Sequence, residues 1–112
     1  MIINSANIFD SLPKDLSLEV FEEIIHTSAI RIERIISKGH SSPDTGWYDQ
    51  DENEWVMVVE GKATLEFEDG SKRELSTGDY INILAHVKHK VVQTDPNQRA
   101  CKLFCVSSIF YK

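Results

Sequence analysis

The stretch of sequence that decides the fold is residues 54–70, EWVMVVEGKATLEFEDG. Two short apolar runs are joined at Gly61, and the second run ends on Asp69-Gly70. Glycine adopts the positive φ angle of a tight hairpin turn without strain, and Asp-Gly is among the strongest hairpin signals in a sequence. Between these turns every second residue from Ala63 to Phe67 is apolar, which is typical of a strand with one buried face. The stretch therefore predicts two consecutive β-hairpins.

The same pattern extends in both directions from this stretch. Short apolar runs alternate with turn residues such as Thr77-Gly78-Asp79, and long helical patterns are missing. Two hairpins followed by further strands imply an all-β, mainly antiparallel sheet that must close or stack to hide its apolar face. We expect strands over residues 20–26, 30–37, 47–49, 54–60, 63–67, 73–75, 80–83, 89–94 and 102–106.

Length and charge limit the classes of function. At 112 residues the chain has the size of one domain. Its formal net charge of -6 repels phosphate backbones and anionic lipid headgroups, so we expect neither nucleic acid nor a membrane as partner. Cys101 and Cys105 lie in one predicted strand, roughly 13 Å apart at about 3.3 Å per residue. They are too far apart for a disulfide, which favours reduced thiols and a cytoplasmic location.

The first 18 residues are less regular than the rest. The apolar pairs on either side of Pro13 are compatible with an edge strand and a short helical turn packed over the sheet, or with a dimer arm. Apolar residues at both ends of the chain, Ile2-Ile3 and residues 109–111, could likewise pair across a two-fold axis. A homodimer is therefore one expectation, and packing of both ends on their own sheet is the alternative.

Polar residues with ligand chemistry gather just before the decisive stretch. Strand alternation places Tyr48 and Gln50 on one face, and it places Glu54 on the same face as the apolar residues that follow it. If residues 51–53 form the loop of a three-residue hairpin, Gln50 and Glu54 become cross-strand neighbours with Cβ atoms about 5 Å apart. Two oxygen-bearing side chains then converge on one point.

The spacing of these residues resembles that of the cupin family. The first cupin motif runs Gly-x5-His-x-His-x3-Glu-x6-Gly, and Glu54 and Gly61 match its second half. The second motif runs Gly-x5-Pro-x-Gly-x2-His-x3-Asn, and Gly78 and His89 match its glycine and histidine. The resemblance spans roughly residues 30–106 and implies a single cupin domain over 1–112, a jelly-roll β-barrel of antiparallel strands.

Several positions depart from the cupin pattern. Tyr48 and Gln50 stand where the family has the two histidines of its first motif, and Ser42 stands at the first glycine. In the second motif His86 replaces glycine, and Leu84 and Gln93 replace proline and asparagine. Two imidazole ligands are therefore missing, and one additional imidazole is gained.

The resemblance implies a metal site built from the remaining ligands. Cupins with complete motifs usually hold a divalent metal through three histidines and one glutamate. The corresponding set here is Gln50, Glu54 and His89, with zinc, manganese, iron or nickel as candidate metals. A neutral amide is a weak ligand, so we expect weaker binding than at a three-histidine site. A self-satisfied hydrogen-bonded cluster without metal is the alternative.

Two classes of function follow from this pocket. In the first, a metal-dependent isomerase, lyase or oxygenase acts on a small oxygenated substrate, and Tyr48 or His86 transfers a proton. His86 reaches the pocket only if Val87-Lys88 turns or bulges. In the second, a non-catalytic module binds a sugar or a carboxylate in the barrel mouth. The sequence leaves open which of the two applies.

Overall fold

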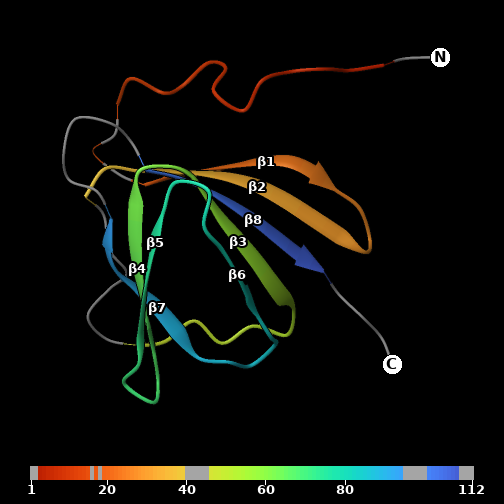
Figure 1. Cartoon of the computed structure of the whole chain (residues 1–112). Coiled ribbons are helices and arrows are strands. Elements are labelled where there is room, and N and C mark those ends of the chain that lie inside the picture. The colour runs from red at the N-terminus through yellow and green to blue at the C-terminus, as the bar shows by residue number, and fades with distance from the viewer. Residues whose placement is uncertain (1–2, 16, 18, 40–45, 95–100, 109–112) are drawn as a thin grey trace.

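The computed structural model describes residues 3–15, 17, 19–39, 46–94 and 101–108, the last range by its backbone alone. These residues form eight strands and contain no helix, and therefore none long and apolar enough to cross a membrane (Figure 1). The strands are β1 Val20–His26, β2 Ile30–Ser37, β3 Asn53–Glu60, β4 Lys62–Phe67, β5 Lys72–Ser76, β6 Tyr80–Ile83, β7 His89–Thr94 and β8 Cys101–Ser108.

The strands are arranged in two antiparallel sheets. The larger sheet has the order β1-β2-β8-β3-β6, and the smaller has the order β5-β4-β7. In the larger sheet β8 lies between β2 and β3, so the last described strand is the central strand of this sheet. The described strands of one sheet do not pair with those of the other, so backbone hydrogen bonds between these strands do not close the barrel. The two sheets face each other and enclose a shared interior.

The core lies between these two sheets. Its buried residues come from β3 and β6 on one side and from β4 and β5 on the other. They are Val56, Val58, Ala63, Leu65, Leu75 and Ile83. Val58 is fully buried, and the predicted alternation of the decisive stretch is therefore confirmed for its apolar side. The hydrophobic contact between the sheets replaces the missing hydrogen bonds as the force that holds them together.

Most predicted strands are confirmed, but one is wrong. Strands 20–26, 30–37, 80–83 and 89–94 have the predicted bounds, and four others differ by one or two residues at an end. Residues 47–49 form no strand, and Tyr48 instead makes an isolated antiparallel bridge to His89. The expected hairpin around residues 51–53 is therefore wrong, because β3 pairs with β6 and β8. β8, which is distant in the sequence, pairs with β3 where the segment at residues 47–50 was expected to pair. The hairpin expected at Gly61 is also wrong, because β3 and β4 lie in different sheets, whereas the hairpin at Asp69-Gly70 is confirmed by the pairing of β4 with β5.

The N-terminal segment lies on the outer surface of the larger sheet (Figure 1). Its described residues contain a turn at 8–11 and neither the expected edge strand nor a helical turn. The side chain of Arg34 donates to the carbonyl oxygens of Ile8 at 3.0 Å and Asp10 at 2.6 Å, and it pairs with Glu22. The backbone carbonyls of the segment thus hold it on the sheet. Of the residues expected to pair in a dimer, Ile3 is exposed, and Ile2 and residues 109–111 lie outside the described residues.

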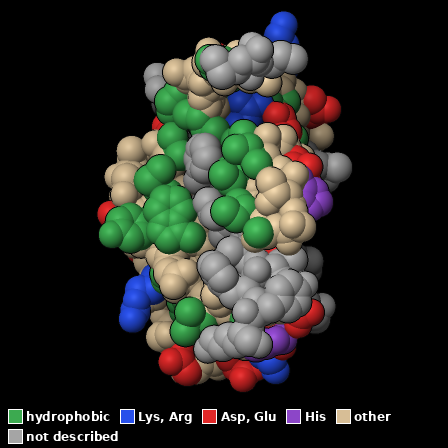
Figure 2. Space-filling model, turned by 90° about the vertical axis from the view of Figure 1, so that its right-hand side faces the viewer, with side chains coloured by type: hydrophobic (Ala, Val, Ile, Leu, Met, Phe, Trp, Pro, Cys, Tyr) green, Lys and Arg blue, Asp and Glu red, His purple; other side chains and the backbone are tan. Residues whose placement is uncertain are grey.

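The outer face of the larger sheet carries apolar side chains that remain accessible. Strand alternation places Ile25, Ile30 and Tyr80 on this face, and each is exposed. The Tyr80 ring lies 5.5 Å from the Trp55 ring, measured between centroids. Figure 2 shows hydrophobic side chains gathered on the side of the molecule toward which β8 runs.

Candidate functional site

A cavity of about 180 Å³ lies between the two sheets. Strands of both sheets contribute to its wall, together with the segment that precedes β3. Its lining residues are Glu19, Phe21, Arg31, Glu33, Ile35, Tyr48, Gln50, Glu54, Val56, Leu65, His89 and Val91. Aliphatic and aromatic side chains supply half of these residues, and charged, amide and imidazole side chains supply the other half.

The cavity brings together four of the residues singled out from sequence. Glu54 enters from the start of β3 and His89 from the start of β7. Tyr48 reaches it because its backbone exchanges two hydrogen bonds with His89, with N···O distances of 2.8 and 3.2 Å. Gln50 is two residues further and lies on the same side as Tyr48. The expected convergence of Gln50 and Glu54 therefore occurs, although through a different pairing from the predicted hairpin.

His89 is oriented by contacts at both ring nitrogens. The side chain is 5% exposed, Nδ1 lies 2.8 Å from the carbonyl oxygen of Val87, and Nε2 lies 3.6 Å from Oε1 of Glu54. A carbonyl accepts but cannot donate, so Nδ1 carries a proton and Nε2 faces the carboxylate. Burial disfavours the imidazolium, but the Glu54 carboxylate and the Val87 carbonyl outweigh this cost and raise the pKa of His89 above its ordinary value.

The side-chain oxygen of Gln50 is a buried hydrogen-bond acceptor without a partner among the described residues. Its Oε1 atom is inaccessible to solvent and has no hydrogen-bond partner among the described residues. Buried polar atoms are nearly always satisfied, because an unmade hydrogen bond costs roughly 1–3 kcal/mol. An unpaired oxygen in the wall of a cavity therefore indicates a donor or a cation that belongs in that cavity.

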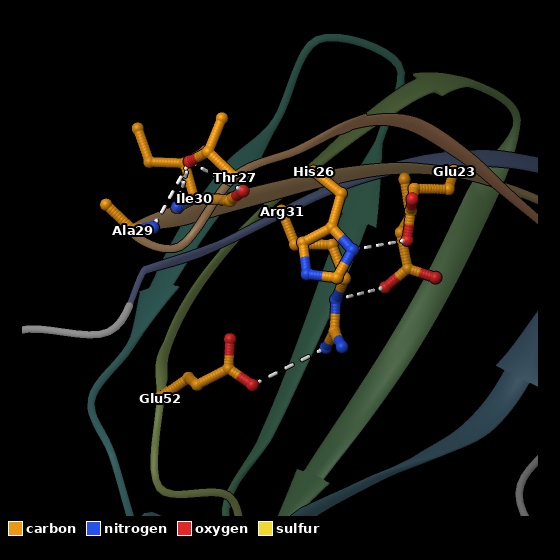
Figure 3. A network of polar contacts seen from close by, with 8 residues as sticks. Glu23, His26, Thr27, Ala29, Ile30, Arg31 and Glu52 are labelled. Carbon is orange, nitrogen blue, oxygen red and sulfur yellow. Dashed lines mark hydrogen bonds and ion pairs between the residues drawn. The ribbon is translucent and has the colours of Figure 1, made fainter.

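Charged residues of β2, together with Glu19 just before β1, complete the site and were not singled out from sequence. Nε of Arg31 lies 2.9 Å from Oε1 of Glu33, and Nη2 lies 3.6 Å from Oε1 of Glu52 (Figure 3). Glu19 accepts a hydrogen bond from the hydroxyl of Ser37. Arg31 and Glu33 share a strand face with Ile35, and this alternation was visible in the sequence. It did not reveal which face of β2 is internal, because Ile30, Ile32 and Ile36 occupy the other one.

Comparison with known proteins agrees with this arrangement. The cupin domain profile matches residues 33–107. The chain belongs to the cupin family. The expected fold and family are thereby confirmed, and the matched range extends from within β2 to β8. No protein with a curated description matches this cupin significantly.

Solved structures similar to this cupin include one with substantial sequence identity. A Ralstonia eutropha protein, provisionally assigned as a mannose-6-phosphate isomerase, is 34% identical with a TM-score of 0.90, covering 96% of this chain and 100% of that one. An RmlC-like cupin with a double-stranded β-helix fold from Methanocaldococcus jannaschii is 19% identical with a TM-score of 0.71, covering 97% and 93%. The second likeness supports the fold alone.

His86 does not lie in the cavity of this cupin. Its ring lies outside, 63% exposed, with Nδ1 at 2.7 Å from Oδ1 of Asp49 and Nε2 at 3.3 Å from Oδ1 of Asp51. The backbone at His86 has a φ angle of 66°, which turns the chain between β6 and β7 and directs the side chain away from His89. The turn that was required to bring His86 inward therefore has the opposite effect, and His86 is not among the residues that line the cavity.

The chemistry of the remaining donors permits a loosely held divalent cation. Gln50 offers an unpaired amide oxygen, Glu54 a carboxylate and His89 the nitrogen opposite its carbonyl-bonded Nδ1. Anchoring one imidazole nitrogen on a carbonyl is the usual way in which a metal-binding histidine is oriented. Among the described residues, however, no three His, Cys, Asp or Glu side chains gather as a metal site. The set fits a cation more weakly bound than at a three-histidine centre.

Proposed function

We propose that this cupin binds a small oxygenated molecule in the cavity between its sheets, with a divalent cation held by Gln50, Glu54 and His89. The observation that carries the proposal is the buried, unpaired Oε1 of Gln50 in the wall of the cavity. A cation or a ligand hydrogen would satisfy this atom. The 34% identity to a protein provisionally assigned as a mannose-6-phosphate isomerase supports a small-molecule ligand.

The side chains around the cation site have different roles in binding the ligand and in proton transfer. When bound, zinc, manganese, iron or nickel would polarise an oxygen of the ligand as a Lewis acid. Tyr48 is 43% exposed and lines the cavity, so its hydroxyl is positioned to donate a hydrogen bond or a proton to a ligand that enters from solvent. When no cation is bound, Glu54 and His89 can exchange a proton between the carboxylate and Nε2 of the imidazole. Isomerase, lyase or oxygenase chemistry would draw on this set.

Metal analysis of the protein purified without chelator tests the cation part of this proposal. We expect close to one transition metal per chain in the wild type. Rebinding should be at least about tenfold weaker in Glu54→Gln, which replaces a carboxylate with a neutral amide, and in His89→Ala, which removes the imidazole. Glu74→Gln, which changes an exposed carboxylate outside the cavity, should bind like the wild type. Equal metal content in all four proteins would contradict the assignment of these ligands.

Ligand binding separates the catalytic form of the proposal from a binding module. A wild type that binds a small oxygenated molecule without any metal would exclude the metal-dependent enzyme and support the non-catalytic binding module. In that case Glu54 and His89 would contact each other in place of a cation. A wild type that binds neither metal nor ligand would overturn both. We also propose a cytoplasmic location, since Cys101 and Cys105 lie on one strand and cannot form a disulfide within it.

A further inference from the structure

We infer that the outer face of the larger sheet binds a second copy of this chain, in an isologous contact of this face with itself. None of the residues on which the contact is built lines the cavity, so it is independent of the proposed function. The residue types on the face, its charge and its size all point to this partner.

Two rows of residues cross the outer face from β1 to β6. Antiparallel register aligns these residues on neighbouring strands, and aligned residues share a face of the sheet. The first row contains Ile25, Ile32, Val106, Trp55 and Asn82. The second row contains Glu22, Arg34, Phe104, Met57 and Tyr80. Apolar residues therefore occupy most of both rows, across the full width of the sheet.

Apolar side chains on this face remain accessible at both of its edges. Ile25 on β1 and Tyr80 on β6 are 48% and 65% exposed, and Ile30, next to the first row on β2, is also exposed. Trp55 is half-buried, and its ring lies against that of Tyr80. Soluble monomers rarely expose contiguous apolar patches larger than a few hundred Å². A face of this kind therefore indicates a protein interface.

The charge of this face favours a second copy over a charged partner. In the two rows the charged residues are Glu22 and Arg34, and they pair with each other. The whole chain has a formal net charge of -6, so two copies repel each other wherever carboxylates meet. A face that binds its own copy must be complementary to itself, and the two rows satisfy this condition because they carry no net charge. The same rows offer no unpaired charge for recognising an acidic or a basic partner.

The two halves of the face are complementary under two-fold symmetry. β8 is the central strand, with the isoleucines of β1 and β2 on one side and Trp55, Met57 and Tyr80 on the other (Figure 1). A two-fold axis that runs parallel to β8 between the copies lays the aliphatic half of one face on the aromatic half of the other. Aromatic residues and methionine are enriched at interfaces, particularly in their buried centres.

The face is large enough for a stable dimer. Five strands about 4.8 Å apart, with up to eight residues of about 3.3 Å each, give a face of roughly 24 by 26 Å, or about 600 Å² in projection. This area includes the part on which the N-terminal segment lies. A standard interface covers about 800 Å² of accessible surface on each partner. Because side chains make a surface uneven, accessible area exceeds projected area, and the face falls in the standard size class.

Sedimentation velocity over a dilution series of the full chain tests this interface. We expect a dimer at micromolar concentration. Ile25→Glu and Tyr80→Glu, one at each edge of the face, should weaken association by at least about a hundredfold, because two-fold symmetry brings each new carboxylate into the desolvated contact twice. Val87→Glu adds the same charge at a side chain that is 40% exposed and lies outside the two rows, so it should leave the dimer unchanged.

Three outcomes would overturn the inference. A wild type that stays monomeric at the concentration of an NMR sample would leave the face to a different partner or to the termini of its own chain. A dimer that neither Ile25→Glu nor Tyr80→Glu weakens would use another surface. Equal weakening by Val87→Glu would show that net charge, rather than this face, controls association.

The fluorescence of Trp55 reports on the same face without altering it. In a Trp47→Phe chain Trp55 is the sole tryptophan. Its emission should shift to longer wavelength as dilution separates the two copies, because water then reaches the ring. Emission that stays constant while the mass falls from dimer to monomer would place the contact elsewhere, whether or not the charged variants fold.

Discussion

At the scale of single residues, His86 fixes the loop that carries Gln50. The His86 ring lies between Asp49 and Asp51, the two sequence neighbours of Gln50. The His86 amide also donates to the carbonyl oxygen of Gln50 at 2.8 Å. Three contacts from one residue outside the cavity therefore hold the backbone from which Gln50 reaches inward. His86 is a positioning residue in this arrangement.

His86→Asn tests this positioning role, because asparagine tolerates the left-handed backbone conformation and loses the two ion contacts. We expect the free energy of unfolding to fall by less than about 1 kcal/mol, since the contacts are exposed. The amide of residue 86 should exchange with solvent faster, and binding in the cavity should weaken severalfold. His26→Asn removes the exposed ion contact to Glu23 and is the matched control. Unchanged exchange at residue 86 would contradict the role of the ring.

At the scale of secondary-structure elements, Arg34 joins the N-terminal segment to the outer face of β2. Its side chain is 9% exposed and bonds to two backbone carbonyls and to Glu22. A buried guanidinium with several hydrogen bonds stabilises the folded state only as long as its partners remain in place. The segment before β1 is thus tied to the sheet by side-chain contacts such as those of Arg34 rather than by strand pairing.

Arg34→Met should release this segment. Methionine fills the volume of the aliphatic stem but leaves Glu22 and the two carbonyls without their donor, so we expect a loss of about 2–4 kcal/mol in urea unfolding. Limited proteolysis within residues 3–15 should also become faster. Arg73→Met changes an exposed arginine on β5 and should have little effect. Equal stability of the two variants would show that the segment is held by other contacts.

At the scale of the whole molecule, apolar contact between the two sheets holds the fold together. Leu75 on β5 is 6% exposed and belongs to the core cluster, but it does not line the cavity. Leu65, by contrast, belongs to both. The part of the interior around Leu75 therefore stabilises the sheets, and the part around Leu65 also shapes the binding site.

Leu75→Ala should separate stability from binding. Removing a buried leucine side chain typically costs about 2–5 kcal/mol, a large share of the stability of a small domain. Urea unfolding should show this loss, whereas ligand affinity measured well below the transition should remain close to the wild type. Leu84→Ala makes the same change at a side chain that is 58% exposed and should change stability by less than about 0.5 kcal/mol. Similar unfolding midpoints for the two variants would contradict the position assigned to the core.

The sequence by itself determined eight of the nine predicted strands, the hairpin at Asp69-Gly70 and most of the candidate site. The turn at Gly61 is present, but it connects strands of different sheets. Turn residues such as Gly61 and the alternation around Leu65 are local signals, because backbone conformation and strand faces depend on neighbouring residues. The spacing that resembles cupins pointed to Glu54 and His89, and both line the cavity. Homodimerisation through the chain termini stays a prediction.

Only the tertiary structure decided which segments meet. The pairing of Tyr48 with His89, the inward position of Arg31 and the outward position of His86 all depend on contacts between residues far apart in the chain. Both faces of β2 carry apolar residues, so alternation alone could not show which face is internal. The lining of the cavity exists only after the two sheets have been brought together, because neither sheet alone supplies all of it.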